Sequence, residues 1–153
     1  MKFTITTPLY YVNDKAHIGS AYTTSACDAL ARYKRHLGLD VEFITGVDEH
    51  GLKIQRTASQ NNIAPKDHCN LISNQYIELW KKWLISNNKF IRTTSSNHKH
   101  TVEVFFSKVM ESGDIYLGQQ KGWYCVGCEE YKENLELGSK HICEIHQKEL
   151  EWR

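Results

Sequence analysis

The 153-residue sequence contains no apolar run that approaches the ~20 residues of a membrane-spanning helix. Its beginning, "MKFTITTPLYY", has a single lysine and lacks the apolar core and small-residue cleavage site of a secretory signal peptide. No membrane partner is therefore expected. The expected location is the cytosol, or the interior of an organelle after import.

The sequence also lacks an excess of charge of one sign, because 19 lysine and arginine residues face 18 aspartate and glutamate residues. This balance counts against a protein that binds DNA or RNA without regard to sequence, since such binding depends on neutralising phosphates. The apolar share of 41% and the charged share of 24% are typical of a globular protein. No internal repeat or low-complexity segment is present, and the sequence does not specify an oligomeric state.

Strands and helices alternate along most of the chain. Period-two patterns predict strands at 2–7 and 41–46, and helical spacing predicts helices from about 19 to 37, after 51, from 65, and from about 98 to 112. The stretch "SNNKFIRTTSSN", residues 86–97, is expected to be a loop. Alternation of this kind is typical of an α/β fold with a parallel sheet flanked by helices.

The pattern changes at Ile115, where short strand-like segments, glycines and a group of cysteine and histidine residues begin. We therefore expect one domain over residues 1–114 and the start of a second over 115–153. The final "LEWR" has no stop signal, so the sequence is expected to be cut off inside this second region.

The first candidate site is the tetrapeptide His-Ile-Gly-Ser at 17–20, between the first strand and the first helix. Helix N-termini at the carboxyl edge of such a sheet offer free N–H groups that bind phosphate. His17 and Ser20 lie three residues apart, so their side chains are expected to reach one point, and Gly19 allows close approach of a ligand. The alternative interpretation is that Ser20 only caps the helix.

The second candidate site follows the second strand, in the segment "TGVDEHG" at 45–51. Asp48 is the carboxylate best placed at the same edge of the sheet, where it could meet the ammonium group of a substrate. The alternative interpretation is a solvated acidic loop.

The third candidate is a metal site. Cys125 and Cys128 form C-x2-C, fourteen residues follow, and Cys143 and His146 form C-x2-H. Three thiolates and one imidazole at this spacing are typical of a tetrahedral zinc site, and four protein ligands leave no open position, so one structural Zn²⁺ per chain is predicted. His141 is a rival for the fourth ligand. Cys27 and Cys69 are expected to be packing residues.

Three segments together resemble the start of methionyl-tRNA synthetases, which are class I aminoacyl-tRNA synthetases. They are "TTPLYYVNDKAHIGSAYTTSACDALARYKRHLG", "FITGVDEHGLKIQRTA" and the later pair "KFIRTTSSNH" and "SGDIYLGQQKGWYCVGCEEY". The resemblance implies the first half of a Rossmann-type catalytic domain, followed by a small connective region with a zinc knuckle. It also implies a methionine–tRNA ligase, a cytoplasmic enzyme of protein biosynthesis whose substrates are methionine, ATP with Mg²⁺, and tRNA(Met).

The resemblance also implies roles for single residues. His17, Gly19 and Ser20 would bind ATP, and His17 and Ser20 would act in catalysis. Ser20 stands where the family usually has histidine. A second group of three residues would form the methionine site: Leu9, Tyr11 and Asp48.

One expected part of the family is missing from the sequence, the lysine-rich KMSKS loop of the second Rossmann half. The isolated chain is therefore expected to be inactive. Two alternatives stay open: a non-catalytic truncated relative that binds tRNA or a protein partner, and another nucleotidyl transferase with a His-x-Gly-His type signature. The zinc knuckle and Asp48 disfavour the second alternative.

Overall fold

The computed structural model describes residues 1–132 and 141–153. Residues 133–140, which belong to the expected second region, lie outside the described residues. The chain separates into two compact units, Met1–Phe105 and Phe106–Arg153. The division falls inside helix α4 (Ser96–Glu111), whereas the boundary expected from the sequence, at residue 114, lies just after that helix and stays a prediction.

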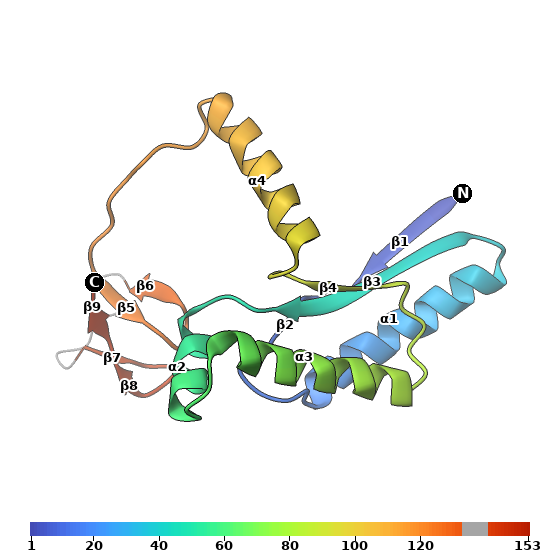
Figure 1. The fold of residues 1–153 in the computed structure, drawn as a ribbon, viewed down its shortest axis with the longest axis horizontal. Helices are drawn as coiled ribbons and strands as arrows, with labels where there is room; N and C mark the ends of the chain where they lie inside the picture. Colours follow the sequence, from blue (N-terminus) through green and yellow to red (C-terminus); the bar gives the residue numbers. More distant parts are fainter. Residues whose placement is uncertain (133–140) are drawn as a thin grey trace. The chain divides into compact units, whose positions relative to one another are not determined.

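The first unit is built on a parallel sheet (Figure 1). Strand β3 (Asp40–Asp48) is central: it pairs with β1 (Lys2–Thr6), with the short β2 (Tyr10–Tyr11) and with β4 (Lys89–Arg92). Between β1 and β2 the chain advances four residues while β3 advances three, because Pro8 interrupts the ladder. The strand therefore resumes after the proline and ends beside Asp48.

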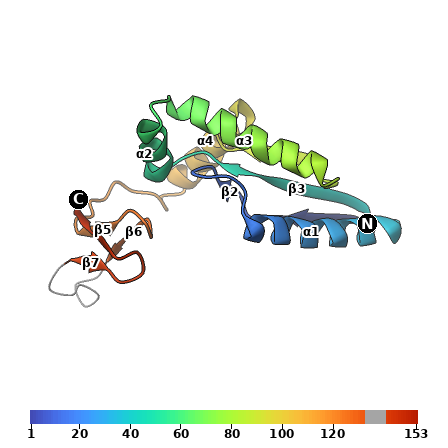
Figure 2. The ribbon, with the colours of Figure 1, turned by 90° about the horizontal axis from the view of Figure 1, so that it is seen from below.

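Helices α1 (Ile18–His36) and α3 (Pro65–Lys82) cover the same face of this sheet (Figures 1 and 2). Val41 and Phe43 pack with α1, and Val47 packs with the buried Tyr76 and Trp80 of α3. These three β3 residues are spaced by two and four, so they point to one side of the sheet. By the same alternation, Asp48 points to the opposite side.

The α/β class and the parallel sheet expected from the sequence are confirmed, as are the four helices, including α2 (Leu52–Gln60). The expected loop at 86–97 is wrong in part. Residues 89–92 form β4, because "KFIR" places Phe90 against the α3 core cluster while Lys89 stays exposed. Four residues between polar segments give too short a pattern to separate a strand from a loop.

The second unit contains, in its described part, β5 (Trp123–Cys125), β6 (Glu130–Lys132), β7 (Ile142–Cys143), β8 (Lys148–Glu149) and β9 (Glu151–Trp152). Among its described residues, the buried apolar cluster has three members, namely Cys125, Cys143 and Leu150. Among the residues that the structure describes, no helix is long and apolar enough to cross a lipid bilayer.

Candidate active site and metal centre

His17 caps the first turn of α1. Its backbone is extended (φ −114°, ψ 175°), and its Nδ1 accepts a hydrogen bond from the Gly19 N–H at 3.0 Å. Because Nδ1 accepts this bond, Nε2 carries the ring proton and can donate it to an anion. A side chain at Gly19 would strike this ring, since an added Cβ would lie 2.8 Å from Cε1 of His17. The glycine thus leaves room for the imidazole to fold back over the helix mouth.

Ser20 does not join His17 at one point, contrary to the expectation from their spacing. Ser20 is 2% exposed, its carbonyl accepts from the Tyr10 hydroxyl at 3.2 Å, and its side chain hydrogen-bonds with Tyr76. Side chains three residues apart lie on the same face only when both residues are helical, whereas His17 lies just before α1 with an extended backbone. The serine hydroxyl therefore faces the core.

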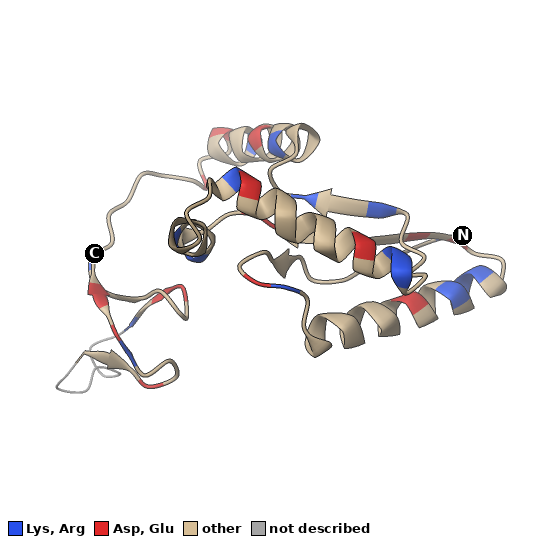
Figure 3. Cartoon of the chain, turned by 60° about the horizontal axis from the view of Figure 1, so that its bottom comes forward, with Lys and Arg blue, Asp and Glu red and all other residues tan. Residues whose placement is uncertain are grey.

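The mouth of α1 has the electrostatics of an anion site. Its first turn contains no acidic residue (Figure 3). Its last turn contains Lys34, Arg35 and His36. The loop before it is anchored by His68 of α3, which is buried and lies with Nε2 2.8 Å from the Val12 carbonyl. The first turn of α1 thus places no carboxylate of its own beside the free N–H groups and partial positive charge of the helix N-terminus.

Asp48 and Tyr11 are register partners at the ends of β3 and β2, so they point to the same side of the sheet. Both are partly buried. Lys53 lies over the Tyr11 ring, with its Nζ 5.6 Å from the ring centroid. Leu9, just before β2, is 40% exposed. The structure therefore brings Tyr11 and Asp48 side by side at the carboxyl edge of the sheet.

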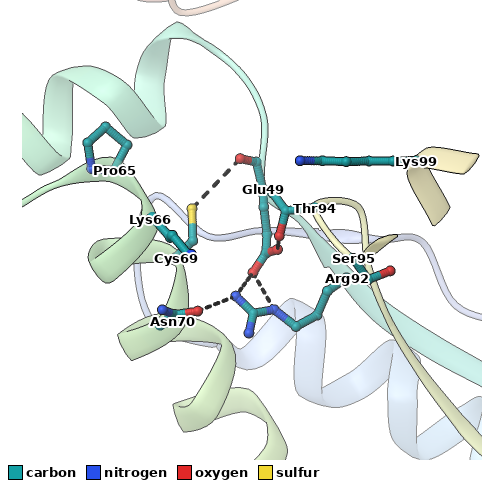
Figure 4. A pocket seen from close by; sticks show the side chains of 9 residues that line it. All are labelled: Glu49, Pro65, Lys66, Cys69, Asn70, Arg92, Thr94, Ser95 and Lys99. Atoms are coloured by element: carbon teal, nitrogen blue, oxygen red, sulfur yellow. Dashed lines mark hydrogen bonds and ion pairs between the residues drawn. The ribbon is translucent and has the colours of Figure 1, made fainter. Parts of the chain in front are cut away.

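An ion pair between Glu49 and Arg92 lies beside Asp48 and was not predicted from the sequence, where a solvated acidic loop was the alternative for the "DEHG" segment. The Glu49 side chain is fully buried. Its Oε1 accepts a hydrogen bond from Nε of Arg92 and forms an ion pair with Nη2 of Arg92, both at 2.7 Å (Figure 4). Ser73 of α3 donates to the same carboxylate at 2.6 Å, and Thr94 donates to its other oxygen. Arg92 also donates to Asn70 at 2.7 Å.

Four members of this network, Glu49, Asn70, Arg92 and Thr94, line a cavity of about 500 Å³. None of the three residues expected to bind methionine lines it. Burial raises the pKa of Glu49, but the hydrogen bonds from Arg92, Ser73 and Thr94 outweigh burial, so its pKa lies below the usual range. Glu49 therefore contributes stability above its unfolded-state pKa of about 4.3, and this contribution is lost as the pH falls through the lower, folded-state value.

Ser73→Ala is expected to lower the free energy of unfolding by about 1.5–3 kcal/mol, because it removes a buried hydrogen bond to a charged group. Chemical denaturation at neutral pH measures this loss. Ser25→Ala is the matched control, since Ser25 is exposed on α1, and it should change stability by no more than about 0.5 kcal/mol. Equal effects of the two substitutions would contradict the role of Ser73 in holding Glu49.

The four expected metal ligands come together in the second unit. The sulfur atoms of Cys125, Cys128 and Cys143 and a ring nitrogen of His146 all lie within 4.8 Å of one another. Cys128 Sγ is 3.6 Å from Cys143 Sγ and 3.3 Å from His146 Nδ1. A tetrahedral Zn²⁺ with bonds of about 2.0–2.3 Å places its ligand atoms about 3.3–3.8 Å apart, which these two separations match, so the donor types and their grouping fit zinc.

The two halves of this cluster have the same backbone geometry. Glu129 and Gln147, each four residues after the first cysteine of its half, have positive φ angles of 59° and 50°. Each donates its N–H to the carbonyl of that cysteine at 2.7 Å. Cys128 N–H also points to Cys125 Sγ at 3.3 Å, as expected for a knuckle that stabilises thiolate.

Gly127 lies in the turn that joins β5 to β6. An added Cβ at this position would lie 2.5 Å from Cγ of His146, so the glycine leaves room for the ligand ring. His141 does not join the cluster; its ring stacks on Trp123 with centroids 4.0 Å apart. Cys69 is buried and Cys27 is half-buried, which agrees with packing roles.

The comparisons with known proteins agree with this geometry. The family model described as tRNA synthetases class I (M) matches residues 3–149. The chain is 56% identical over 152 residues to a methionine–tRNA ligase of Nostoc sp., covering 99% of this chain and 29% of the relative. It is 52% identical over 145 residues to the chloroplastic/mitochondrial methionine–tRNA ligase of Arabidopsis thaliana, covering 95% and 24%.

Solved structures give the same result. Mycobacterium tuberculosis methionyl-tRNA synthetase in complex with methionyl-adenylate matches with a TM-score of 0.92 and 32% identity, over 99% of this chain and 30% of that one. The chain thus spans 24–30% of the length of these three proteins. It contains the helix mouth, the carboxylate edge and the cysteine–histidine cluster described above, and it belongs to the class I tRNA synthetases of the M family.

Proposed function

We propose that this chain supplies the amino-acid-activating edge of a methionine–tRNA ligase. The observation that carries the proposal is the pairing of Tyr11 with Asp48 on one side of the sheet, at the same edge as the α1 N-terminus. A carboxylate for an ammonium group and an anion site for phosphates are the two contacts that activation of an amino acid by ATP requires.

In this mechanism, the free N–H groups of α1 and the Nε2–H of His17 bind the ATP phosphates. The carboxylate oxygen of methionine attacks the α-phosphorus and forms a new P–O bond. The bond between the α-phosphorus and the oxygen that bridges it to the β-phosphate breaks, and pyrophosphate leaves. His17 stabilises the charge that builds up on the phosphoryl oxygens. Because its hydroxyl faces the core, Ser20 contributes its backbone N–H. Mg²⁺ enters with ATP as part of the substrate.

Asp48 holds the methionine ammonium group, while Tyr11 and Leu9 shape the space for its side chain. The second step passes the methionyl group to the 3′ end of tRNA(Met). The reaction takes place in the cytosol or inside an organelle, wherever tRNA is charged. Zn²⁺ on Cys125, Cys128, Cys143 and His146 would give the second unit the stability that its small apolar cluster lacks, and it takes no part in catalysis.

The test uses a hybrid enzyme, in which this chain replaces the matching segment of the Nostoc methionine–tRNA ligase. ATP–pyrophosphate exchange should depend on methionine and run at a rate close to that of the Nostoc parent. A folded hybrid that supports no exchange, while the parent does, would favour the non-catalytic alternative. Exchange with a different amino acid would overturn the assignment of the substrate.

His17→Ala in the hybrid enzyme is expected to slow adenylate formation by something on the order of 10²-fold, the loss typical of one electrostatic donor at a reacting group. The affinity for methionine should barely change, because His17 lies on the phosphate side. Single-turnover kinetics measures the first quantity and equilibrium binding the second. A normal activation rate would mean that His17 is only a helix cap. Ser20→His, which restores the usual family residue, should be tolerated.

A further inference from the structure

Thr93, the first residue after β4, contacts both acidic residues at the end of β3. Its hydroxyl oxygen accepts a hydrogen bond from the Glu49 backbone N–H at 2.9 Å, and the hydroxyl donates to Oδ1 of Asp48 at 3.4 Å. Thr93 is 8% exposed. Its carbonyl lies 3.4 Å from Nε2 of His50, so the residue touches three consecutive positions of the "DEH" segment.

Side chains alternate along β3 and β4, so the Arg92–Glu49 pair and the Thr93–Asp48 pair lie on opposite sides of the sheet. The β3–β4 backbone pairing ends at Val47 and Arg92. Beyond this point, side-chain hydrogen bonds connect the two strand ends. On the side of the sheet covered by α3, Arg92 forms an ion pair with the buried Glu49 (Figure 4). On the other side, Thr93 meets Asp48. The two contacts therefore join the ends of β3 and β4 separately, one on each side of the sheet.

Two hydrogen bonds fall on one oxygen of Asp48. Oδ1 accepts from the Thr93 hydroxyl and from the His50 backbone N–H, the latter at 3.2 Å. Together they restrict rotation of the carboxylate and leave Oδ2 as the oxygen that can meet an ammonium group. A carboxylate held in its binding orientation before the ligand arrives loses less conformational freedom on binding.

We propose that Thr93 is a positioning residue for methionine recognition, holding Asp48 in the orientation that receives the substrate ammonium group. The inference rests on the function proposed above and extends it to a residue that contacts no substrate. It assigns to the Thr93 hydroxyl a contribution to methionine affinity, separate from the stabilising contribution of the neighbouring Glu49 network.

Thr93→Val in the hybrid enzyme tests this, because valine keeps the shape and removes the hydroxyl. The methionine KM should rise by about five- to tenfold, the loss expected for one hydrogen bond. The kcat and the ATP KM should stay within about twofold. Thr93→Ser, which restores the hydroxyl, should return the methionine KM to within about twofold of the wild-type value. If the valine variant does not fold, Thr93→Ala serves the same comparison.

Ser73→Ala is the matched control, since it removes a buried hydroxyl from the Glu49 network without touching Asp48. It should lower stability and leave the methionine KM unchanged. An unchanged methionine KM in Thr93→Val, or an equal rise of the methionine KM in Ser73→Ala, would overturn the inference about Thr93. The proposed function would still stand if the hybrid enzyme shows methionine-dependent exchange. A hybrid enzyme without that exchange would overturn both.

Discussion

Asp48→Ala in the hybrid enzyme should raise the methionine KM by something on the order of 10²- to 10³-fold. The substitution leaves the ammonium group of bound methionine without its partner, and loss of one member of a buried charge pair costs roughly 3–5 kcal/mol. The ATP KM should change little, because the phosphates bind at the mouth of α1. ATP–pyrophosphate exchange at varied methionine concentrations measures both quantities.

Two further variants sharpen this result. Asp48→Asn keeps a hydrogen-bond acceptor but loses the charge, so its methionine KM should lie between those of the wild type and the alanine variant. Asp40→Ala removes an exposed aspartate at the opposite end of the same strand and should have no effect. Equal methionine KM values in all four proteins would mean that "DEHG" is only a solvated acidic loop.

Removal of the metal should have the largest effect on structure. The purified chain is expected to contain about one Zn²⁺, and Cys128→Ser or a chelator should release it. Structural zinc sites contribute apparent binding energies of about 10–16 kcal/mol, and the described part of the second unit has only three buried apolar residues to replace them. Residues beyond about 115 should therefore unfold, while the sheet of the first unit stays folded.

Elemental analysis measures the zinc, and amide hydrogen exchange locates the unfolding. Cys27→Ser is the control, because Cys27 lies on α1 and is not part of the cluster; its zinc content should equal that of the wild type. Full zinc retention in Cys128→Ser would contradict the ligand set, and loss of protection in β1 or β3 would contradict the independence of the first unit.

The metal cluster and the long helices could be predicted from the sequence because their signals are local. Two cysteines separated by two residues can close on one ion wherever the turn occurs, so Cys125 and Cys128 were identifiable by spacing alone. Pro65 in the first turn and a helically spaced apolar stripe that includes Tyr76 and Trp80 predict helix α3. Neither inference required knowledge of distant contacts.

The Glu49 network could not be predicted in this way because its members are far apart in sequence. Ser73 lies 24 positions from Glu49 and Arg92 lies 43, and no spacing rule connects them. A partial signal was present in "KFIRTT": had residues 89–92 been taken as a strand, alternation would have placed Arg92 and Thr93 on opposite sides of the sheet. The expected loop concealed this.

Ser20 shows a second limit of sequence reasoning. The spacing of His17 and Ser20 is the same whether both lie in the helix or one lies before it, yet the two cases direct the serine hydroxyl differently. The structure has His17 as the cap and Ser20 inside the helix, turned to Tyr76. The position of a helix start, which sequence patterns define only to within a few residues, decided the outcome.

The most direct test of the account is calorimetric titration of methionine, without ATP, into the hybrid enzyme and two of its variants. The account predicts saturable binding to the wild type, an equal affinity in His17→Ala, and an affinity weaker by something on the order of 10²-fold or more in Asp48→Ala. Equal affinities in the wild type and Asp48→Ala would contradict the claim that this edge of the sheet binds the methionine ammonium group.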